Sequence, residues 1–89
     1  MPVFYFTDRT HSYGDITREV RIQVNNILIV ITLEKNSDYW CIHFYNLIKD
    51  EPSQYIWSTN ISNKLALNII KEAKEYQDYI YYRDLKMLL

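Results

Sequence analysis

The stretch "ITREVRIQVNNILIVITLE", residues 16–34, decides the fold because two apolar segments flank a pair of asparagines. In the first segment apolar and polar residues alternate, a period of two that is typical of a half-buried strand. Asparagine tolerates positive φ, so the Asn-Asn pair favours a two-residue hairpin turn. This turn sets Ile22 opposite Ile29 and brings apolar residues together on one face. Pattern and turn therefore predict one register for a hairpin of residues 16–24 and 27–34.

Three further segments extend this hairpin into a sheet. "VFYF" begins a short apolar and aromatic strand, and "QYIWST" has the composition of another. Between them, "YWCIHFYNLI" is apolar on both faces, which is typical of a central or covered strand. The strands predicted in addition to the hairpin are residues 3–7, 39–48 and 54–59.

The period changes from about residue 60 onward. On a helical wheel with Leu65 as zero, one arc holds mostly apolar side chains and the opposite side holds charged ones. The apolar arc contains Leu65, Ile69, Ala73, Tyr76 and Ile80, and it is widened by Ala66 and Ile70. We therefore predict an amphipathic helix over residues 61–82, with Asn60 or Ser62 as its N-cap. Because Arg83 and Asp84 return to the apolar arc, the helix either ends near residue 82 or leaves the core in its last turn. The expected fold is a single α+β domain, residues 1–89: an antiparallel sheet of four to five strands in hairpin order, with one long C-terminal helix packed on one face.

Composition and charge exclude several classes of protein. Hydrophobic residues make up 48% of the 89 residues, which argues against disorder. A net charge of −1 fits neither a duplex-DNA binder nor an acidic mimic of DNA. The longest strongly apolar run, residues 27–33, is far too short to span a bilayer, and the N-terminus lacks the pattern of a signal peptide. We expect a cytoplasmic protein that does not associate with membranes.

Two groups of residues contain side chains that could catalyse a reaction or bind a metal. His11 lies between Asp8 and Asp15 in a polar segment and could act as a general base, which makes a small enzyme using this loop the second alternative function. Cys41 and His43 share one face of a predicted strand, but a structural zinc site needs four ligands. With one glycine the chain has no glycine-rich phosphate loop. We expect no catalytic residue, no metal and no cofactor.

The first alternative function is binding of single-stranded nucleic acid. Arginines near the first hairpin form a candidate basic patch, and tyrosines offer stacking surfaces for bases. The residues of this hypothesis are Arg9, Arg18, Arg21, Tyr13 and Tyr55. The absence of a basic excess makes nucleic acid the less favoured partner.

The stretch "EYQDYIYYRDL", residues 75–85, suggests contact with another protein. The wheel assigns Tyr76 to the core and Tyr81 to its rim, whereas Tyr79 and Tyr82 fall on the charged side. Tyrosine and arginine are enriched at protein–protein contacts because they bury much area with few rotatable bonds. Arg83 and Lys86 follow the two tyrosines at i+4, where they can lie over the rings.

A second group of candidate contact residues lies on the hairpin. Leu28 and Val30 fall on its outer face, which one helix cannot cover, so a further chain is expected there, most simply a second copy. The predicted function is that of a small non-enzymatic protein that binds another protein, the concrete version being an inhibitor or regulator from a phage or mobile element that occludes a host protein. The predicted partner-binding residues are Tyr79, Tyr82, Arg83, Lys86, Leu28 and Val30, and a homodimer is expected.

Overall fold

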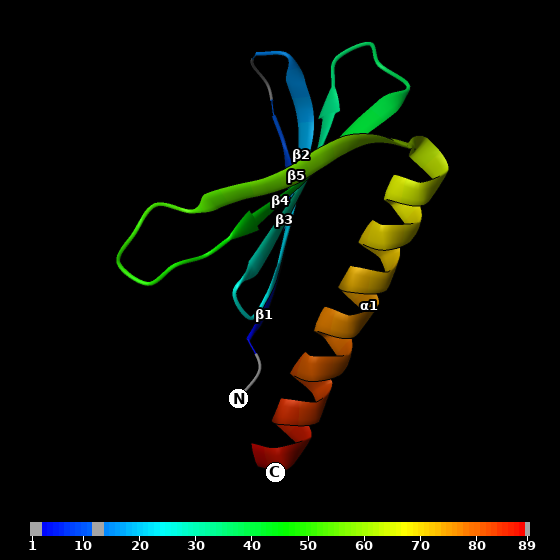
Figure 1. Cartoon of the computed structure of the whole chain (residues 1–89). Coiled ribbons are helices and arrows are strands. Elements are labelled where there is room, and N and C mark those ends of the chain that lie inside the picture. Colours follow the sequence, from blue (N-terminus) through cyan, green and yellow to red (C-terminus); the bar gives the residue numbers. More distant parts are fainter. Residues whose placement is uncertain (1–2, 12–13, 89) are drawn as a thin grey trace.

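The structure, a computed structural model, describes residues 3–11 and 14–88. Within these residues five strands precede one helix, and the strands form a single antiparallel sheet in the order β1-β2-β3-β4-β5 (Figure 1). The elements are β1 (Phe4–Thr10), β2 (Ile16–Val24), β3 (Ile27–Glu34), β4 (Tyr39–Asn46), β5 (Gln54–Ser62) and α1 (Asn63–Leu88). The predicted α+β arrangement, with hairpin-ordered strands and one helix packed against the sheet, is confirmed.

The central hairpin has the register that the sequence predicts. Val24 pairs with Ile27 and Ile22 with Ile29, so the apolar residues of β2 and β3 meet on one face. Asn25 adopts a positive φ of 54° in the turn, a conformation that asparagine accepts more readily than most residues. The turn also positions β1, because the amide of Val3 donates to the side-chain oxygen of Asn25 at 3.0 Å.

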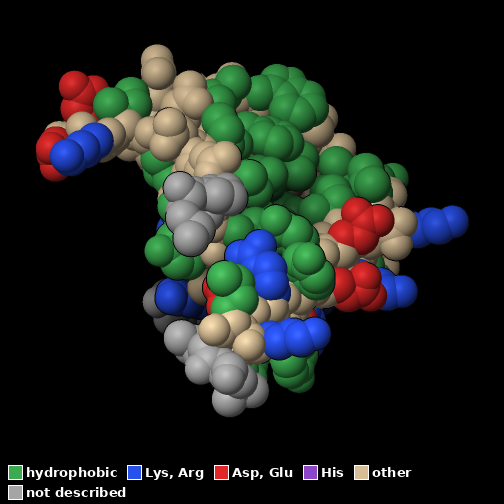
Figure 2. Space-filling model, turned by 90° about the horizontal axis from the view of Figure 1, so that it is seen from below, with side chains coloured by type: hydrophobic (Ala, Val, Ile, Leu, Met, Phe, Trp, Pro, Cys, Tyr) green, Lys and Arg blue, Asp and Glu red, His purple; other side chains and the backbone are tan. Residues whose placement is uncertain are grey.

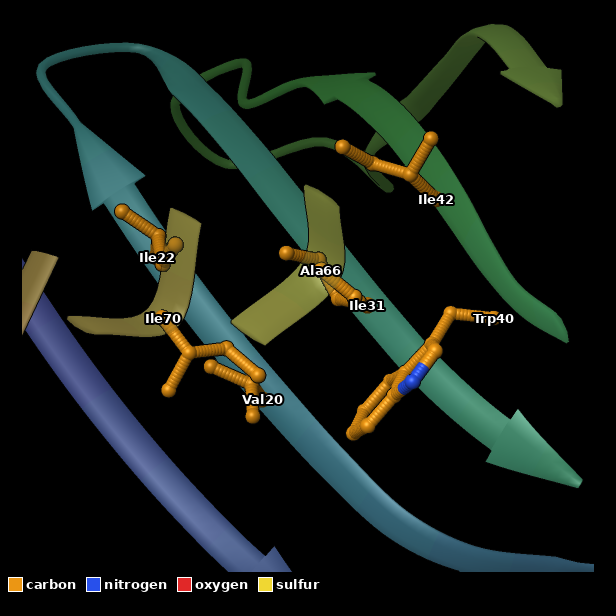
Figure 3. Close-up of a cluster of buried hydrophobic side chains, with 7 residues drawn as sticks. All are labelled: Val20, Ile22, Ile31, Trp40, Ile42, Ala66 and Ile70. Carbon is orange, nitrogen blue, oxygen red and sulfur yellow. The ribbon is translucent and has the colours of Figure 1, made fainter. Parts of the chain in front are cut away.

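One face of the sheet forms the core with α1. Ala66 and Ile70 of the helix lie against Val20, Ile31 and other side chains of the three central strands (Figure 3). The seven buried residues of this cluster are Val20, Ile22, Ile31, Trp40, Ile42, Ala66 and Ile70. Because α1 is the only helix in the described part of the chain, the other face of the sheet is left open.

Three strands have bounds that differ from the predicted ones, and one of them is β5, which continues to Ser62 instead of ending at residue 59. β1 continues to Thr10 instead of ending near residue 7, because Asp8 faces the core side and forms an ion pair with Arg18 of β2. This cross-strand charge pair extends the ladder through a segment whose polar composition suggested a loop. β4 ends at Asn46, two residues before the predicted end, since the chain there turns into the β4–β5 loop. That loop extends away from α1 (Figure 1).

The helix is longer than predicted and is rotated about its axis. It follows β5 directly, with Ser62 as its cap: the Ser62 hydroxyl accepts a hydrogen bond from the Leu65 amide at 3.2 Å. It continues to Leu88 instead of ending near residue 82. Its buried face is centred on Ala66 and Ile70, whereas Leu65, the expected centre, is half-exposed. Within the described residues, no helix is long and apolar enough to cross a membrane.

The molecule is elongated for its size. Its radius of gyration is 14.6 Å, compared with about 12 Å for a compact chain of this length. A helix of 26 residues is about 39 Å long, and it accounts for most of the 47 Å longest dimension. The buried helix positions end at Ile70 and the partly buried residues packed on them at Ala73, so the last turns of α1 extend past the core.

Candidate functional site

The tyrosines of α1 all lie at the molecular surface. Tyr79 is 59% exposed and Tyr82 is 67% exposed, as the wheel predicts. Tyr81 and Tyr76, however, are more exposed than their predicted rim and core positions imply. Tyr76 only touches the core margin, where its ring meets that of Phe4 edge-on at 4.8 Å.

These four tyrosines form two ring pairs along the helix. The ring of Tyr79 stacks on that of Tyr76, with centroids 6.2 Å apart, and the rings of Tyr81 and Tyr82 meet edge-on at 5.5 Å. Both distances are within the range of favourable aromatic contacts. The rings therefore hold one another in place, and a partner would meet a partly ordered aromatic surface. We call the surface formed by Tyr76, Tyr79 and Tyr82 the tyrosine face; Tyr81 lies on another side of the helix, about 160° around the axis from Tyr79.

The two basic residues at the end of the helix differ in their surroundings. Arg83 donates from Nε and a terminal nitrogen to the Asp84 carboxylate at 3.2 and 3.1 Å, so its guanidinium is held by its sequence neighbour. Lys86 is an exposed cation in the last turn, where positive charge complements the helix dipole. Arg83 is thus positioned by Asp84, and its charge is already partly balanced.

Leu28 and Val30 lie on the open face of the sheet, away from the tyrosine face. Val30 is only 8% exposed, because its neighbours on β2 and β4, Arg21 and His43, flank it. A shallow cavity of about 410 Å³ passes over these strands and is lined by Leu28, Val30, His43, Tyr45 and others. The predicted contact residues therefore belong to two separate surfaces.

The open face of the sheet carries many polar side chains. Residues that pair across it include Thr7, Arg21, Thr32, Cys41 and Asn60, most of them polar. Antiparallel sheets commonly leave such a face in contact with water. Because side chains on both sides of Leu28 and Val30 are polar or charged, this face can stay in contact with water, and its covering by a second copy stays a prediction.

The uncovered apolar surface lies instead at the outer edge of the sheet, in β5. Tyr55, Ile56 and Trp57 follow one another in the chain and are 57%, 48% and 54% exposed. On the face that α1 packs against, the ring of Trp57 packs on that of Phe44 in β4 at 5.5 Å, whereas on the open face the ring of Tyr55 meets that of Tyr45 at 6.0 Å. We call these three residues with Phe44 the β5 aromatic cluster. Figure 2 shows a broad area of hydrophobic side chains on the underside of the molecule, between charged groups at its margins.

Sequence reasoning missed this cluster, although one signal was present. The segment "QYIWSTNIS" contains no charged residue and no proline, which is unusual for a strand at the edge of a sheet. The predicted hairpin order already makes this strand an edge strand, and the path of α1 was needed to see that its aromatic residues stay exposed.

Of the three arginines of the nucleic-acid hypothesis, Arg9 and Arg21 line one shallow cavity on the open face, whereas Arg18 lies on the other face. Arg18 faces the core side, where it forms a two-pronged contact with Asp8 at 3.0 and 2.7 Å and lies over the Trp40 ring at 5.5 Å. Arg9 and Arg21 face the open side, on β1 and β2, whereas Tyr55 lies on the opposite edge strand. Tyr13 lies outside the described residues.

The loop of the enzyme hypothesis is also divided between the two faces. His11 lies near Glu19 on β2, with its Nε2 3.5 Å from a carboxylate oxygen. Asp8 is engaged by Arg18 on the core side. Asp15 accepts a backbone hydrogen bond from Lys35 at 2.6 Å through its main-chain carbonyl. The histidine therefore pairs with Glu19, a residue that the sequence did not connect with it.

The ion pair between Asp8 and Arg18 makes a pH-dependent contribution to stability. The hydrogen bond from Arg18 lowers the pKa of the Asp8 carboxyl, and the positive charges of Arg18 and Lys74 act in the same direction against the opposing effect of burial. Because the folded-state pKa is below that of the unfolded chain, the stabilisation is present above about pH 4 and is lost as the pH falls through the folded-state pKa.

We expect Asp8→Asn to lower the free energy of unfolding at neutral pH by up to about 1 kcal/mol, since the pair is about one-third exposed. Urea titrations at neutral pH and in acid should show the difference from wild type shrinking as the pH falls. Asp38→Asn, in an exposed turn, changes the same charge and serves as the control. A difference that stays constant into acid would show that Asp8 acts through packing alone.

Cys41 and His43 do not belong to a metal centre in the part of the chain that the structure describes, where no three histidine, cysteine or acidic side chains gather closely enough to hold an ion. Burial raises the pKa of the Cys41 thiol, and the nearby Glu34 carboxylate raises it further. A raised thiol pKa disfavours the thiolate, which is the form that binds metals and attacks electrophiles. Cys41 is thus a partly buried strand residue whose environment favours the thiol over the thiolate.

Comparison with known proteins gives no relative for this arrangement. No family model, no curated protein and no solved structure matches the chain.

Proposed function

We propose that this protein acts by binding another protein through the tyrosine face of α1. The observation that carries the proposal is the exposure of the last three turns of the helix, which extend past the core and present aromatic and apolar side chains. Besides the tyrosines, Leu85 and Met87 are exposed there. In water this surface would be expected to be polar, because a helix end that packs on nothing gains nothing from apolar side chains.

The chemistry of the tyrosine face suits a protein partner. An amphipathic helix that lies in a hydrophobic groove is a common mode of peptide recognition, and its contacts recur at spacings of three, four and seven residues. Tyr79 and Tyr82 are three apart, and Lys86 follows Tyr82 by four. A protein of this type can inhibit its target by occlusion and needs no catalytic group. The most concrete form of the proposal is a small inhibitor or regulator that covers a functional surface of its target.

The proposal is tested by replacing both tyrosines. We expect Tyr79→Ala with Tyr82→Ala to abolish capture of the target from extracts of the source cell, measured by quantitative mass spectrometry. Because both rings are more than half exposed, the free energy of unfolding should change by less than about 1 kcal/mol.

The helix contains a matched control two turns earlier. Glu72 and Glu75 precede Tyr79 and Tyr82 by seven residues each, so they occupy nearly the same side of the helix and are also exposed. Glu72→Ala with Glu75→Ala should leave capture unchanged. If the tyrosine variant retains its captured proteins, or if both double variants lose them equally, the tyrosine face is not the binding surface.

A further inference from the structure

We propose that β5 pairs edge to edge with β5 of a second copy of the chain, so that two sheets join into one across a twofold axis. This inference stands apart from the proposed function, because it uses a different surface and different residues. It begins from the position of β5. Among the described residues β5 hydrogen-bonds to β4 alone, so its outer edge offers backbone donors and acceptors to another strand.

The two edges of the sheet differ in composition. β1 has seven residues, including Asp8 and Arg9, and such charges on an edge discourage pairing with another chain. β5 has nine residues, none charged and none proline. The one feature of β5 that discourages pairing with another chain is a bulge. Phe44 pairs with Trp57 and Tyr45 with Tyr55, so Ile56 is an extra residue between them. Residues 57–62 lie beyond the bulge and form a regular edge.

The solvent-exposed area of the chain is larger than that expected of a compact monomer of the same mass. The chain exposes 7082 Å², whereas a compact monomer of 10.8 kDa exposes about 5,500 Å². The excess of about 1,500 Å² is larger than the roughly 800 Å² that each partner buries in a standard interface. Part of it lies in the β5 aromatic cluster, where an apolar patch is next to an open edge.

A second copy fits this surface better than an unrelated partner. An antiparallel strand can pair with itself about a twofold axis, and such an interface brings the same patch of both chains together. Because β5 is uncharged, the β5 strands of two copies can pair without repulsion between like charges.

The twofold arrangement also accounts for the exposed residues at both ends of β5. When residues 57–61 of two copies run antiparallel about an axis at Thr59, Trp57 lies opposite Ile61 of the second copy, two residues before α1 of that copy begins. Trp57 is half-exposed at one end of the edge, and Leu65 is half-exposed in the first turn of α1 at the other. Pairing brings these two apolar side chains together twice, once on each side of the axis.

The oligomeric state of the full chain tests the inference. Light scattering after size exclusion, from low micromolar to submillimolar concentration, should give twice the chain mass of 10.8 kDa. Trp57→Lys places a charge at the interface and should raise the dimer dissociation constant at least thirtyfold, as expected for an aromatic residue that an interface buries. Tyr82→Lys, an equivalent change of an exposed aromatic residue on α1, should leave the dimer intact.

Hydrogen exchange of the wild-type chain is a second test, and it does not depend on whether a variant folds. Amides on the outer edge of β5 should be protected at high concentration and lose that protection on dilution, whereas amides of β1 should not change. A wild-type mass of 10.8 kDa throughout the concentration range would overturn the proposal. A dimer that survives Trp57→Lys but is lost in Tyr82→Lys would also overturn it, because the interface would then lie on the helix.

Discussion

Trp40→Ala is expected to cost about 3–5 kcal/mol of unfolding free energy, the range for removal of a large aromatic side chain from a core. Trp40 is 1% exposed, and it is the largest of the fully buried side chains. Its indole Nε1 donates to the side-chain oxygen of Asn63 at 2.9 Å, which ties β4 to the first residue of α1. The guanidinium of Arg18 lies over the same ring. One substitution therefore removes core volume, a link between helix and sheet, and a support for the ion pair to Asp8.

This loss is large compared with the whole stability of a small domain, which is about 5–15 kcal/mol and for short chains near the lower limit. Trp40→Ala should therefore be largely unfolded at physiological temperature, as measured by far-ultraviolet circular dichroism in urea at a fixed chain concentration. Trp40→Phe retains most of the ring packing but loses the bond to Asn63, so we expect it to cost about 1–2 kcal/mol. Equal losses in the two variants would mean that the indole hydrogen bond, and not the packed volume, is the main contribution.

Ala66→Glu is expected to detach the helix, at a cost of about 3–5 kcal/mol. Ala66 has no exposed surface and lies where α1 approaches the central strands (Figure 3). Glutamate is a good helix former, so the substitution leaves the intrinsic helix propensity nearly unchanged. It must either bury a carboxylate without a partner or move the helix away from the sheet.

The next residue offers a control for this experiment. Leu67 is 43% exposed, and Leu67→Glu should change the unfolding free energy by no more than about 0.5 kcal/mol. If the helix detaches, an isolated helix of this length is only marginally stable in water, so helical circular dichroism should fall in the Ala66 variant. If both variants are equally stable, Ala66 does not mark the contact between helix and sheet.

Much of the sheet could be predicted from sequence because its determinants are local. In the hairpin of β2 and β3, alternation and the Asn25-Asn26 turn specify the same register, and the structure has that register. β1 was predicted too short because its second half is held by the pairing of Asp8 with Arg18. A polar residue that is satisfied by a partner on another strand looks like a loop residue when only its neighbours are considered.

The helix face was harder to predict for a different reason. A helical wheel places the buried face at the average direction of all apolar side chains. Leu65 and Tyr76 moved this predicted face away from its observed centre at Ala66 and Ile70. A periodic pattern does not distinguish a side chain buried within the domain from one exposed to a partner. For the same reason the β5 aromatic cluster was not identified, since its exposure follows from strand order and from the path of α1.

The strand order of the sheet also has a consequence for how the chain folds. Each strand pairs only with its neighbour in sequence, so the sheet can form as a series of hairpins, each closing a short loop. The contact between Phe4 and Tyr76 instead joins the first strand to the second half of the helix, and it closes nearly the whole described chain into one loop. We therefore expect docking of α1 to be the late step. Until the helix docks, Val20, Ile31 and Trp40 remain open to water, and the interval between hairpin formation and docking is when the chain is most prone to aggregate.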